Sequence, residues 1–240
     1  MNVLDQHVTD QFALYHGDCV EVVAALPSDS IDFSVFSPPF ASLYTYSASP
    51  RDMGNSLDGD EFARHFRFLV RDLLRVTKPG RLIAIHCMQL PTSKVRDGEI
   101  GIRDFRGELI RSFVEEGGIY HSEVCIWKDP VTAMQRTKAL GLLHKTIRND
   151  STMSRQGLAD YLVVIRKPGK NPDPVPHVAP DPLAKVETWQ RYASPVWVTT
   201  RGVDDEGFAI PHADINPSDT LQHRSAREDK DERHICPLQL

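Results

Sequence analysis

Short apolar runs alternate along the chain with stretches whose apolar residues have helical spacing. Phe12 to His16 and Asp32 to Phe36 are β-rich runs, and the segment between them, Cys19 to Leu26, has helical spacing and stops before Pro27. A strand, a helix and a second strand in this order are typical of a parallel sheet with crossover helices. The alternation therefore predicts an α/β fold.

The same pattern continues to Lys167. One helix is expected to begin at Asp60 as its N-cap, and another to run from Asp104 to Glu116. The inner stripe of the first helix is Phe62, Phe66, Leu69, Val70, Leu73 and Leu74, and that of the second is Leu109, Ile110, Phe113 and Val114. The further strands expected are Arg81 to Cys87, Ile119 to Lys128 and Tyr161 to Arg166.

Regular patterns weaken after Lys167. Prolines arrive every few residues from Pro168 to Pro182, and the only later sign of regular structure is a short strand pair within Trp189 to Thr200. Residues 1–168 are therefore expected to form the main domain, and residues 169–233 an irregular appended region.

Composition excludes several classes of protein. The 240 residues are 40% apolar and 25% charged, which is ordinary for a globular chain. The sequence has no run of apolar residues long enough to span a membrane and no signal peptide. The four cysteines are far apart and the ten histidines form no ligand pattern, so we expect free thiols in a reducing cytosol and no metal site.

Charge is distributed unevenly. The net charge is −5, yet the stretch from Met134 to Lys167 is basic and contains only two acidic residues, Asp150 and Asp160. Its basic residues are Arg136, Lys138, Lys145, Arg148, Arg155, Arg166 and Lys167. The stretch is either a surface for a nucleic-acid backbone or a solvated basic loop, and both interpretations remain open.

The sequence Ser37-Pro38-Pro39-Phe40 stands directly after a predicted strand. Ligands of open α/β sheets bind at the carboxyl ends of the strands. The Ser37 hydroxyl and the Pro38 carbonyl are two hydrogen-bond acceptors, and the prolines restrict the backbone that holds them. Two acceptors can hold the two hydrogens of an aromatic amine and aim its nitrogen lone pair at an incoming methyl group. Phe40 can stack on a base taken out of a duplex.

A second candidate site lies one predicted strand earlier, in Gly17-Asp18-Cys19. Asp18 can accept a hydrogen bond from the amino group of an adenine, and the backbone N–H of Cys19 can reach a ring nitrogen. An Asp after Gly at a strand end is also common turn chemistry. The spacing to the Ser-Pro-Pro-Phe motif, through one helix, favours the binding interpretation.

These motifs resemble those of the DNA N4-cytosine and N6-adenine methyltransferases, in the permuted arrangement in which the catalytic half comes first. The resemblance covers His16 to Lys167 and resumes at His234 to Leu240. It is carried by His16-Gly-Asp-Cys, Leu26-Pro-Ser-Asp-Ser-Ile-Asp32, Phe36-Ser-Pro-Pro-Phe40, Leu74-Arg-Val-Thr-Lys-Pro-Gly80 and Ile126-Trp-Lys128.

The resemblance implies a Rossmann-like sheet of the S-adenosylmethionine-dependent methyltransferases, with S-adenosylmethionine as cofactor and double-stranded DNA as partner. Ser37, Pro38, Pro39 and Phe40 would be the catalytic motif, and Asp18 would help to hold the cofactor adenine. Asp160 to Lys167 would be the antiparallel edge strand of the sheet, and residues 169–233 would stand where such enzymes keep a target-recognition region.

The sequence departs from the family pattern in one respect. Residues 234–240, His234 to Leu240, resemble the start of the cofactor-binding half. The glycine-rich Phe-x-Gly-x-Gly turn that follows this start in the family is not present. The sheet is therefore expected to be incomplete, with the missing half in a longer chain or in a second polypeptide. The 240 residues alone are expected to bind S-adenosylmethionine weakly.

A serine at the head of the motif favours cytosine N4 over adenine N6 as the methylated atom. Tyr44 and Tyr46 are candidates for contacts with bases, or are ordinary surface tyrosines. Arg51 to Asn55 is interpreted as a mobile loop, with ordering on DNA as the alternative. Trp127 and Lys128 are either core residues or contacts to the flipped base. His86 is interpreted as a packing histidine whose ring nitrogens have hydrogen-bond partners.

Two functions from other classes remain open. One is a DNA-binding partner without activity, for which the basic stretch would be the working surface. The other is an unrelated α/β protein in which Ser-Pro-Pro is only a turn.

Overall fold

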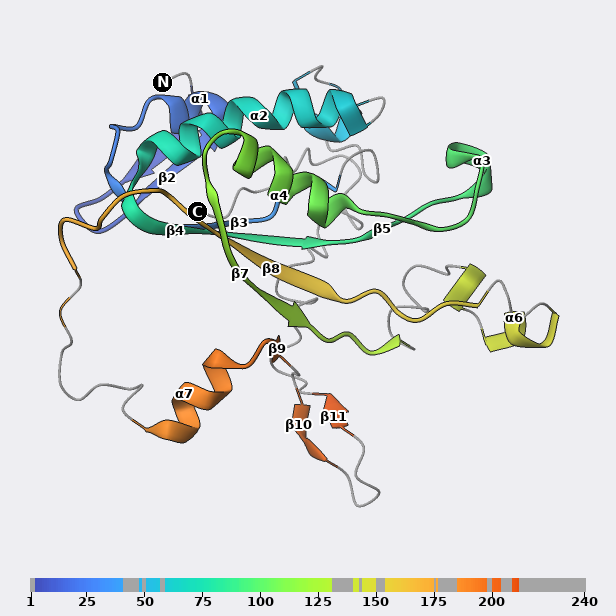
Figure 1. Cartoon of the computed structure of the whole chain (residues 1–240). Coiled ribbons are helices and arrows are strands. Elements are labelled where there is room, and N and C mark those ends of the chain that lie inside the picture. Colours follow the sequence, from blue (N-terminus) through green and yellow to red (C-terminus); the bar gives the residue numbers. More distant parts are fainter. Residues whose placement is uncertain are drawn as a thin grey trace.

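The computed structural model describes residues 3–40, 48, 51–56, 59–130, 140–142, 144–149, 154–174, 176, 185–197, 200–203 and 209–211. Its centre is a mixed five-stranded sheet with the order β3-β4-β8-β7-β9 (Figure 1). The strands are β3 (Ile31–Phe36), β4 (Thr77–Met88), β8 (Asp160–Arg166), β7 (Ile119–Ile126) and β9 (Val196–Trp197). β3 runs parallel to β4 and β9 parallel to β7, whereas β8 is antiparallel to both of its neighbours.

Three helices, α1 (Cys19–Ala24), α2 (Gly59–Val76) and α4 (Phe105–Glu115), lie on one side of this sheet (Figure 1). The inner stripe predicted for α2 is confirmed, because each of its members is at most 8% exposed. Phe66 lies at the middle of this core, with its ring centroid 6.4 Å from that of Phe36 and 6.0 Å from that of Phe113. The α/β alternation in the sequence thus produces one apolar layer between helices and sheet.

The helix ends differ slightly from the predictions. α2 begins at Gly59, so Asp60 lies in its first turn and is not the N-cap. Asp104 does cap α4, since its carboxylate accepts from the backbone N–H of Gly107 at 3.1 Å. The prediction that Val114 faces inward is wrong: it is 48% exposed, because Leu109 and Phe113, one turn apart, define the buried face of α4.

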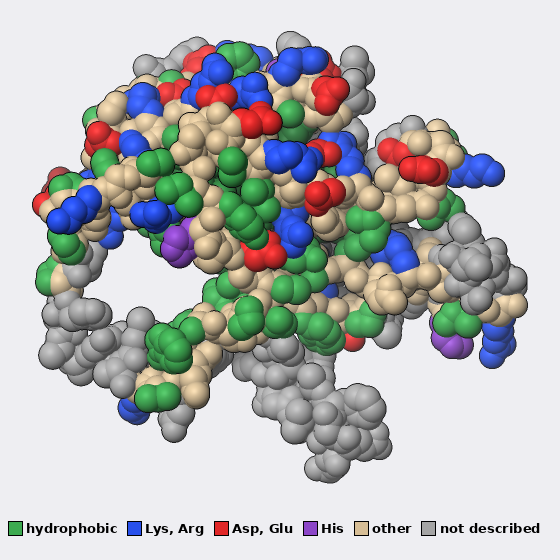
Figure 2. Space-filling view, in the orientation of Figure 1, with side chains coloured by type: hydrophobic (Ala, Val, Ile, Leu, Met, Phe, Trp, Pro, Cys, Tyr) green, Lys and Arg blue, Asp and Glu red, His purple; other side chains and the backbone are tan. Residues whose placement is uncertain are grey.

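The outward sides of α2 and α4 carry charges of both signs. Arg71 Nε lies 2.8 Å from Glu116 Oε2, and Arg67 pairs with Glu115. Figure 2 shows Lys and Arg side chains interspersed with Asp and Glu over this part of the surface. The outward sides of α2 and α4 are therefore polar and exposed to solvent.

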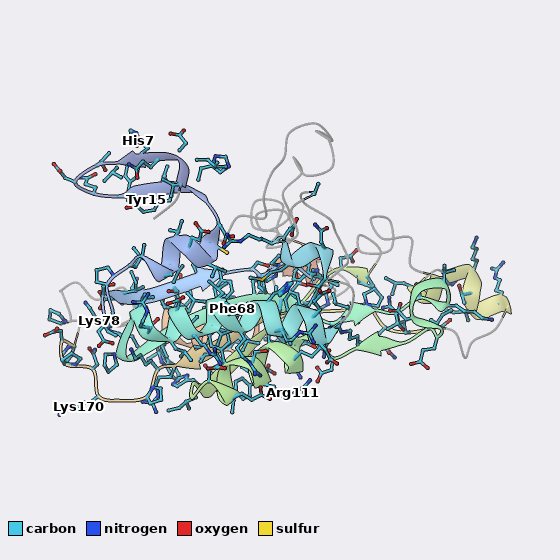
Figure 3. All side chains as sticks on the ribbon, turned by 90° about the horizontal axis from the view of Figure 1, so that it is seen from above. His7, Tyr15, Phe68, Lys78, Arg111 and Lys170 are labelled. Carbon is cyan, nitrogen blue, oxygen red and sulfur yellow. The ribbon has the colours of Figure 1, made fainter. Side chains whose placement is uncertain are left out.

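The first strand pair is not part of the main sheet. β1 (Val3–Val8) pairs antiparallel with β2 (Ala13–Gly17), so the prediction that β2 and β3 belong to one parallel sheet is wrong. The local turn explains the outcome, because Thr9 Oγ1 accepts from the backbone N–H groups of Gln11 and Phe12 and folds β1 back on β2. Figure 3 shows this hairpin, with His7 and Tyr15, set apart from the layer of the sheet and helices.

β8 is also placed differently from the prediction. The resemblance implied an antiparallel edge strand at Asp160 to Lys167, and the strand is antiparallel, but it lies inside the sheet between β4 and β7. Val163 and Ile165 are fully buried. The continuous apolar run from Tyr161 to Ile165 is typical of a strand with neighbours on both sides.

The region after Lys167 is more regular than predicted. It contains α7 (Val186–Ala193) and β9, which extends the main sheet through Cys125 opposite Val196, and it also holds β10 (Thr200–Val203) paired with β11 (Ala209–Pro211). The prediction of a strand pair within Trp189 to Thr200 is wrong, because these residues supply the end of α7 and a strand whose partner is distant in sequence. His234 to Leu240 lies outside the described residues.

The remaining described elements are short. They are η2 (Met53–Asn55), β5 (Leu90–Pro91), α3 (Lys94–Asp97), β6 (Ile102–Arg103), η3 (Leu140–Leu142) and α6 (His144–Asn149). None of the described helices combines the length and apolar character that crossing a membrane requires.

Candidate active site

The Ser37-Pro38-Pro39-Phe40 motif begins where β3 ends. Phe36 lies opposite Ile85 in the parallel β3–β4 pair, so Ser37 follows at the carboxyl edge of the sheet beside the next residue of β4, His86. Pro38 is buried, and Ser37 and Phe40 are half-buried. The position that the sequence indicated for the motif, the carboxyl edge of a parallel strand, is therefore the position it occupies.

Phe40 packs against the protein core. Its ring centroid lies 6.2 Å from that of Phe105 at an interplanar angle of 87°, and 6.3 Å from the His86 ring. Edge-to-face contacts of this kind hold an aromatic ring in place. The half-buried ring is thus fixed beside Ser37, and base stacking by Phe40 stays a prediction.

Four polar side chains form a row across the sheet, which we call the polar row: Ser37, His86, Asp160 and Lys128. Ser37 Oγ lies 3.4 Å from His86 Nδ1, and His86 Nε2 lies 3.1 Å from Asp160 Oδ2. Asp160 Oδ1 in turn lies 2.6 Å from Lys128 Nζ. His86 is 5% exposed and Asp160 2% exposed, so the middle of the row is inside the protein.

Strand geometry explains why these side chains meet. Side chains alternate between the two faces of a strand, and Ile83, Ile85 and Cys87 of β4 face the helices. His86 therefore points to the opposite face. Asp160 opens β8 diagonally across from His86, since Leu162 is the residue opposite His86. Lys128 follows β7, whose Ile126 lies opposite Asp160.

Sequence reasoning assigned Ser37 to the site and named Lys128 as one alternative contact to the base. It gave His86 only a packing role and Asp160 no role in the site. The prediction that His86 is a packing histidine with satisfied ring nitrogens is confirmed, because the residue is buried and both nitrogens meet polar partners. A histidine inside an apolar strand, with an aspartate opening another apolar strand, was the signal that the sequence offered. Their pairing depends on β4 lying beside β8.

Two of the described cysteines, Cys87 and Cys125, are poor candidates for a nucleophile. Burial, followed by the nearby Asp160 charge, raises the pKa of Cys87 to about 12, and burial raises the pKa of Cys125 as well. Cys19, Cys87 and Cys125 form no disulfide, and Cys236 lies outside the described residues. In the described ranges, no three His, Cys, Asp or Glu side chains gather as metal ligands would.

Asp18 is the N-cap of α1. Its Oδ1 accepts from the Val20 backbone N–H at 2.9 Å, and its Oδ2 lies 3.0 Å from Arg51 Nε. Arg51 also contacts Glu21, with Nη1 2.5 Å from Oε1. The roles of Asp18 and Cys19, the first residue of α1, toward an adenine stay predictions, and any such ligand would share Asp18 Oδ2 with Arg51.

The segment from Arg51 to Asn55 is not the mobile loop that the sequence indicated. It contains η2, capped by Asp52, whose carboxylate accepts from the Gly54 backbone N–H at 2.8 Å. Met53 is 7% exposed and belongs to the core. This packing places Arg51 beside the start of α1.

Three of the predicted DNA-contacting residues lie in one part of the molecule. Lys145 and Arg148 are exposed on α6, and the Arg155 backbone N–H donates to the Gly141 carbonyl of η3, which packs against α6. Burial lowers the pKa of Arg155. The other candidates, Tyr44, Tyr46, Arg136 and Lys138, lie outside the described residues.

Solved structures resemble this one, although no protein-family model and no curated protein matches the sequence. One is TTHA0409 of Thermus thermophilus, provisionally named a DNA modification methylase and solved in complex with S-adenosyl-L-methionine. Its TM-score is 0.57 at 18% sequence identity, over 80% of this chain and 67% of that one. A second structure of TTHA0409 gives a TM-score of 0.54 and 17% identity, over 77% of this chain and 66% of that one. PvuII cytosine-N4-specific DNA methyltransferase gives only 0.42, at 17% identity over 63% of this chain and 47% of that one, which is too low to carry an argument.

The likeness to TTHA0409 shows the fold. The chain has a Rossmann-like α/β fold in common with TTHA0409, as the sequence resemblance implied, and it spans about two thirds of the length of TTHA0409.

Proposed function

We propose that this chain is the catalytic part of a DNA methyltransferase that moves a methyl group from S-adenosylmethionine to the exocyclic amine of a base flipped out of duplex DNA. The observation that carries the proposal is the Ser37-Pro38-Pro39-Phe40 motif at the carboxyl end of β3, in a sheet with the fold of TTHA0409. The sequence resemblance to the DNA amino-methyltransferases supports the same reaction.

The motif suits the chemistry of an aromatic amine. The nitrogen lone pair of such an amine is delocalised into the ring, so the nitrogen is a weak nucleophile. Ser37 Oγ and the Pro38 carbonyl accept its two hydrogens, draw the nitrogen toward a pyramidal shape and direct its lone pair. The proline rings restrict the backbone on both sides, so the two acceptors keep their spacing. Positioning of this kind accounts for a large part of the rate of a direct transfer.

We favour cytosine N4 as the methylated atom and keep adenine N6 as the second choice. A serine hydroxyl is a weaker acceptor than the carboxylate expected at the head of the motif in an adenine enzyme. The base must leave the duplex to reach the motif, since its amine is paired inside the stack. Phe40, which lies beside Ser37, would contact the face of that base.

S-adenosylmethionine would supply the methyl group as an electrophilic carbon on sulfur. Asp18 is an acceptor suited to its adenine, and the half-buried Cys19 follows it with a backbone N–H. The 240 residues contain no glycine-rich turn for the methionine part. We therefore infer that a further segment or a second polypeptide completes the cofactor site.

Duplex DNA would approach through basic side chains. Lys145, Arg148 and Arg155, together with Arg136, Lys138 and Tyr44, are the residues we assign to DNA contact. Neutralisation of phosphates by such residues makes binding strongly salt-dependent. The modification enzyme of a restriction system would need these basic residues to bind DNA and the Ser37-Pro38-Pro39-Phe40 motif to methylate it.

The test is transfer of a labelled methyl group from S-adenosylmethionine to DNA, with protein purified from the cells that produce it so that any partner accompanies it. Ser37→Ala is expected to lower turnover about 100-fold or more, with DNA binding retained. Ser34→Ala is the matched control. Ser34 lies in β3, three residues before Ser37; it is 3% exposed and points to the helix-covered face of the sheet. Equal turnover for Ser37→Ala and wild type would contradict the proposal.

Digestion of the labelled DNA to nucleosides identifies the base. N4-methylcytosine is the expected product. Label found only in N6-methyladenine would overturn the preference for cytosine and leave the reaction class intact.

A second candidate function is a half-enzyme, or an inactive DNA-binding partner, that works only with another polypeptide. β3 ends the sheet among the described strands, and on its outer face Phe33 is 57% and Val35 40% exposed. Exposed apolar side chains on an edge strand favour a neighbour there. Calorimetric titration distinguishes the cases: micromolar binding of S-adenosylmethionine to the chain alone would exclude the need for a partner.

A further inference from the structure

We propose that His86, Asp160 and Lys128 orient the Ser37 hydroxyl and provide the path by which the amine loses its proton. This inference rests on the proposed function and goes beyond the Ser-Pro-Pro-Phe motif. It makes His86 the proton acceptor for Ser37, and Asp160 and Lys128 the residues that position His86. Ser37 alone of the four contacts the base.

The contacts define the tautomer of His86. An ionised carboxylate can only accept, so Asp160 Oδ2, 3.1 Å from His86 Nε2, requires a hydrogen on Nε2. In a neutral imidazole the other nitrogen, Nδ1, is then an acceptor. Ser37 Oγ lies 3.4 Å from it, and such contacts shorten when substrate binds.

The direction of the Ser37 hydroxyl follows from this tautomer. Its hydrogen points to His86 Nδ1, so that the oxygen presents a lone pair, and not a hydrogen, to the amine of the bound base. Without His86 the hydroxyl could rotate and donate, which would present a hydrogen to the amine in place of a lone pair. The row therefore decides whether Ser37 acts as an acceptor.

Lys128 pairs with Asp160. Asp160 is 2% exposed, and an isolated charge so deep in a protein is strongly disfavoured. The Lys128 ammonium, 2.6 Å from Asp160 Oδ1, compensates that charge and leaves Oδ2 for the histidine. The carboxylate is thereby available to stabilise a positive imidazolium.

The proton balance of the reaction fits this arrangement. When the amine nitrogen forms its bond to the donated methyl, the electron pair of the donor's carbon–sulfur bond stays on sulfur, and the nitrogen must release one proton. That proton moves to Ser37 Oγ while the Ser37 hydroxyl proton moves to His86 Nδ1. The resulting imidazolium lies between Ser37 and the Asp160 carboxylate, and it returns its proton to water after the product leaves.

Few other ionisable groups surround His86 in the described part of the chain. Asp160 faces it from β8 and Lys128 from the end of β7, and on the β3 side it meets Ser37 and the ring of Phe40. Cys87 is its neighbour on β4 but faces the helices. Arg106 of α4 is 4.5 Å from the centre of the Tyr161 ring and pairs with Glu123, on the helix side of the sheet.

The experiment compares His86→Gln with wild type across a pH series, in the same methyl-transfer assay. A proton acceptor of this kind contributes about 100-fold, so kcat is expected to fall by that factor with KM for DNA unchanged. The pH profile of kcat is expected to differ between wild type and His86→Gln, because glutamine cannot accept a proton. His121→Gln is the control, because His121 is exposed on β7 and its Nδ1 lies 3.0 Å from Oγ of the adjacent Ser122.

A measurement on the folded wild-type protein needs no variant. Nitrogen-15 NMR of the histidines is expected to show His86 with its hydrogen on Nε2. A hydrogen on Nδ1 in the neutral ring would overturn the inference, because Nδ1 could not then accept from Ser37. Added imidazole is expected to restore part of the turnover of His86→Ala, and failure to restore any would count against a proton-accepting role.

The outcomes separate this inference from the proposed function. If Ser37→Ala loses turnover while His86→Gln keeps the wild-type rate and pH profile, the row has no such role and the proposed function stands. If Ser37→Ala keeps full turnover, both proposals are wrong.

Discussion

The two faces of the central sheet are built from the same strands and are used differently. Toward α2 and α4, the strands present apolar side chains that are fully buried, among them Ile83, Ile85 and Ile165. Away from these helices the same strands present the polar row, and the edge strand β3 presents the exposed Phe33 and Val35.

The two faces therefore have different roles: one stabilises the fold, and the other carries the residues of the proposed reaction. The helix-covered face has the packing that makes a folded state stable. The other face places a buried ion pair and a histidine beside the Ser-Pro-Pro-Phe motif, and a buried ion pair is weak evidence for stability. Substitutions on the first face should therefore change the free energy of unfolding, and those on the second should mainly change function.

The largest effect on stability is expected from Phe66→Ala on the helix-covered face. Phe66 is 0% exposed and contacts aromatic rings of β3, α2 and α4. Loss of the ring leaves a cavity and should lower the free energy of unfolding by about 3–5 kcal/mol. Denaturant unfolding followed by circular dichroism measures this loss, and a change under about 1 kcal/mol would show that this face is not the core we describe.

The next largest loss of stability is expected from Asp160→Asn on the face opposite the helices. This substitution sharpens the comparison of the two faces, because it affects both the free energy of unfolding and the proposed reaction. The substitution keeps the shape but leaves Lys128 without its carboxylate, which for a buried pair costs about 3 kcal/mol. The same unfolding assay applies, with Asp32→Asn as control, because Asp32 pairs with Lys78 at the surface. An unchanged midpoint for Asp160→Asn would mean that Lys128 turns to water when its partner is lost.

A smaller effect is expected at the start of α4. Asp104→Ala removes the N-cap and should cost about 1 kcal/mol at neutral pH. The hydrogen bond from the Gln89 side chain, more than any other contact, lowers the pKa of Asp104 below its usual value. Its contribution is therefore present above about pH 4, the range in which the unfolded carboxyl is ionised, and is lost as the pH falls through the lower folded value.

Comparison of the pH dependence of unfolding in wild type and Asp104→Asn measures that contribution. The amide still caps the helix but does not titrate, so the acid loss of stability should be shallower in the variant. Identical acid profiles would show that Asp104 does not contribute to it.

The smallest effect is expected from Phe33→Ala on the outer face of β3. Phe33 is 57% exposed, so its loss should change the free energy of unfolding by no more than about 0.5 kcal/mol. The contrast with Phe66→Ala uses the same substitution on the two faces. A loss of several kcal/mol for Phe33→Ala would mean that another part of the protein covers this face in solution.

Local patterns in the sequence predicted the elements, and non-local pairing decided their arrangement. The stripe of α2, the Asp104 cap and the position of Ser37 at a strand end all follow from short-range spacing, and the structure has them. The hairpin of β1 and β2, the internal place of β8 and the addition of β9 depend on which strands pair, which spacing alone does not determine. α7 was missed because the prolines before it suggested irregular structure throughout.

The candidate site divides in the same way. The motif is contiguous in sequence, so Ser37 to Phe40 could be identified directly. His86, Lys128 and Asp160 come from three other strands and meet Ser37 only through the sheet order β3-β4-β8-β7. Their contacts could be predicted only with that order known.

The most direct test of the central claim is a crystal structure of the protein bound to duplex DNA containing its target. We expect a base turned out of the duplex, with its exocyclic nitrogen within about 3.2 Å of both Ser37 Oγ and the Pro38 carbonyl oxygen. A flipped base whose amine is held by other residues, or a target base that stays stacked in the duplex, would contradict the claim.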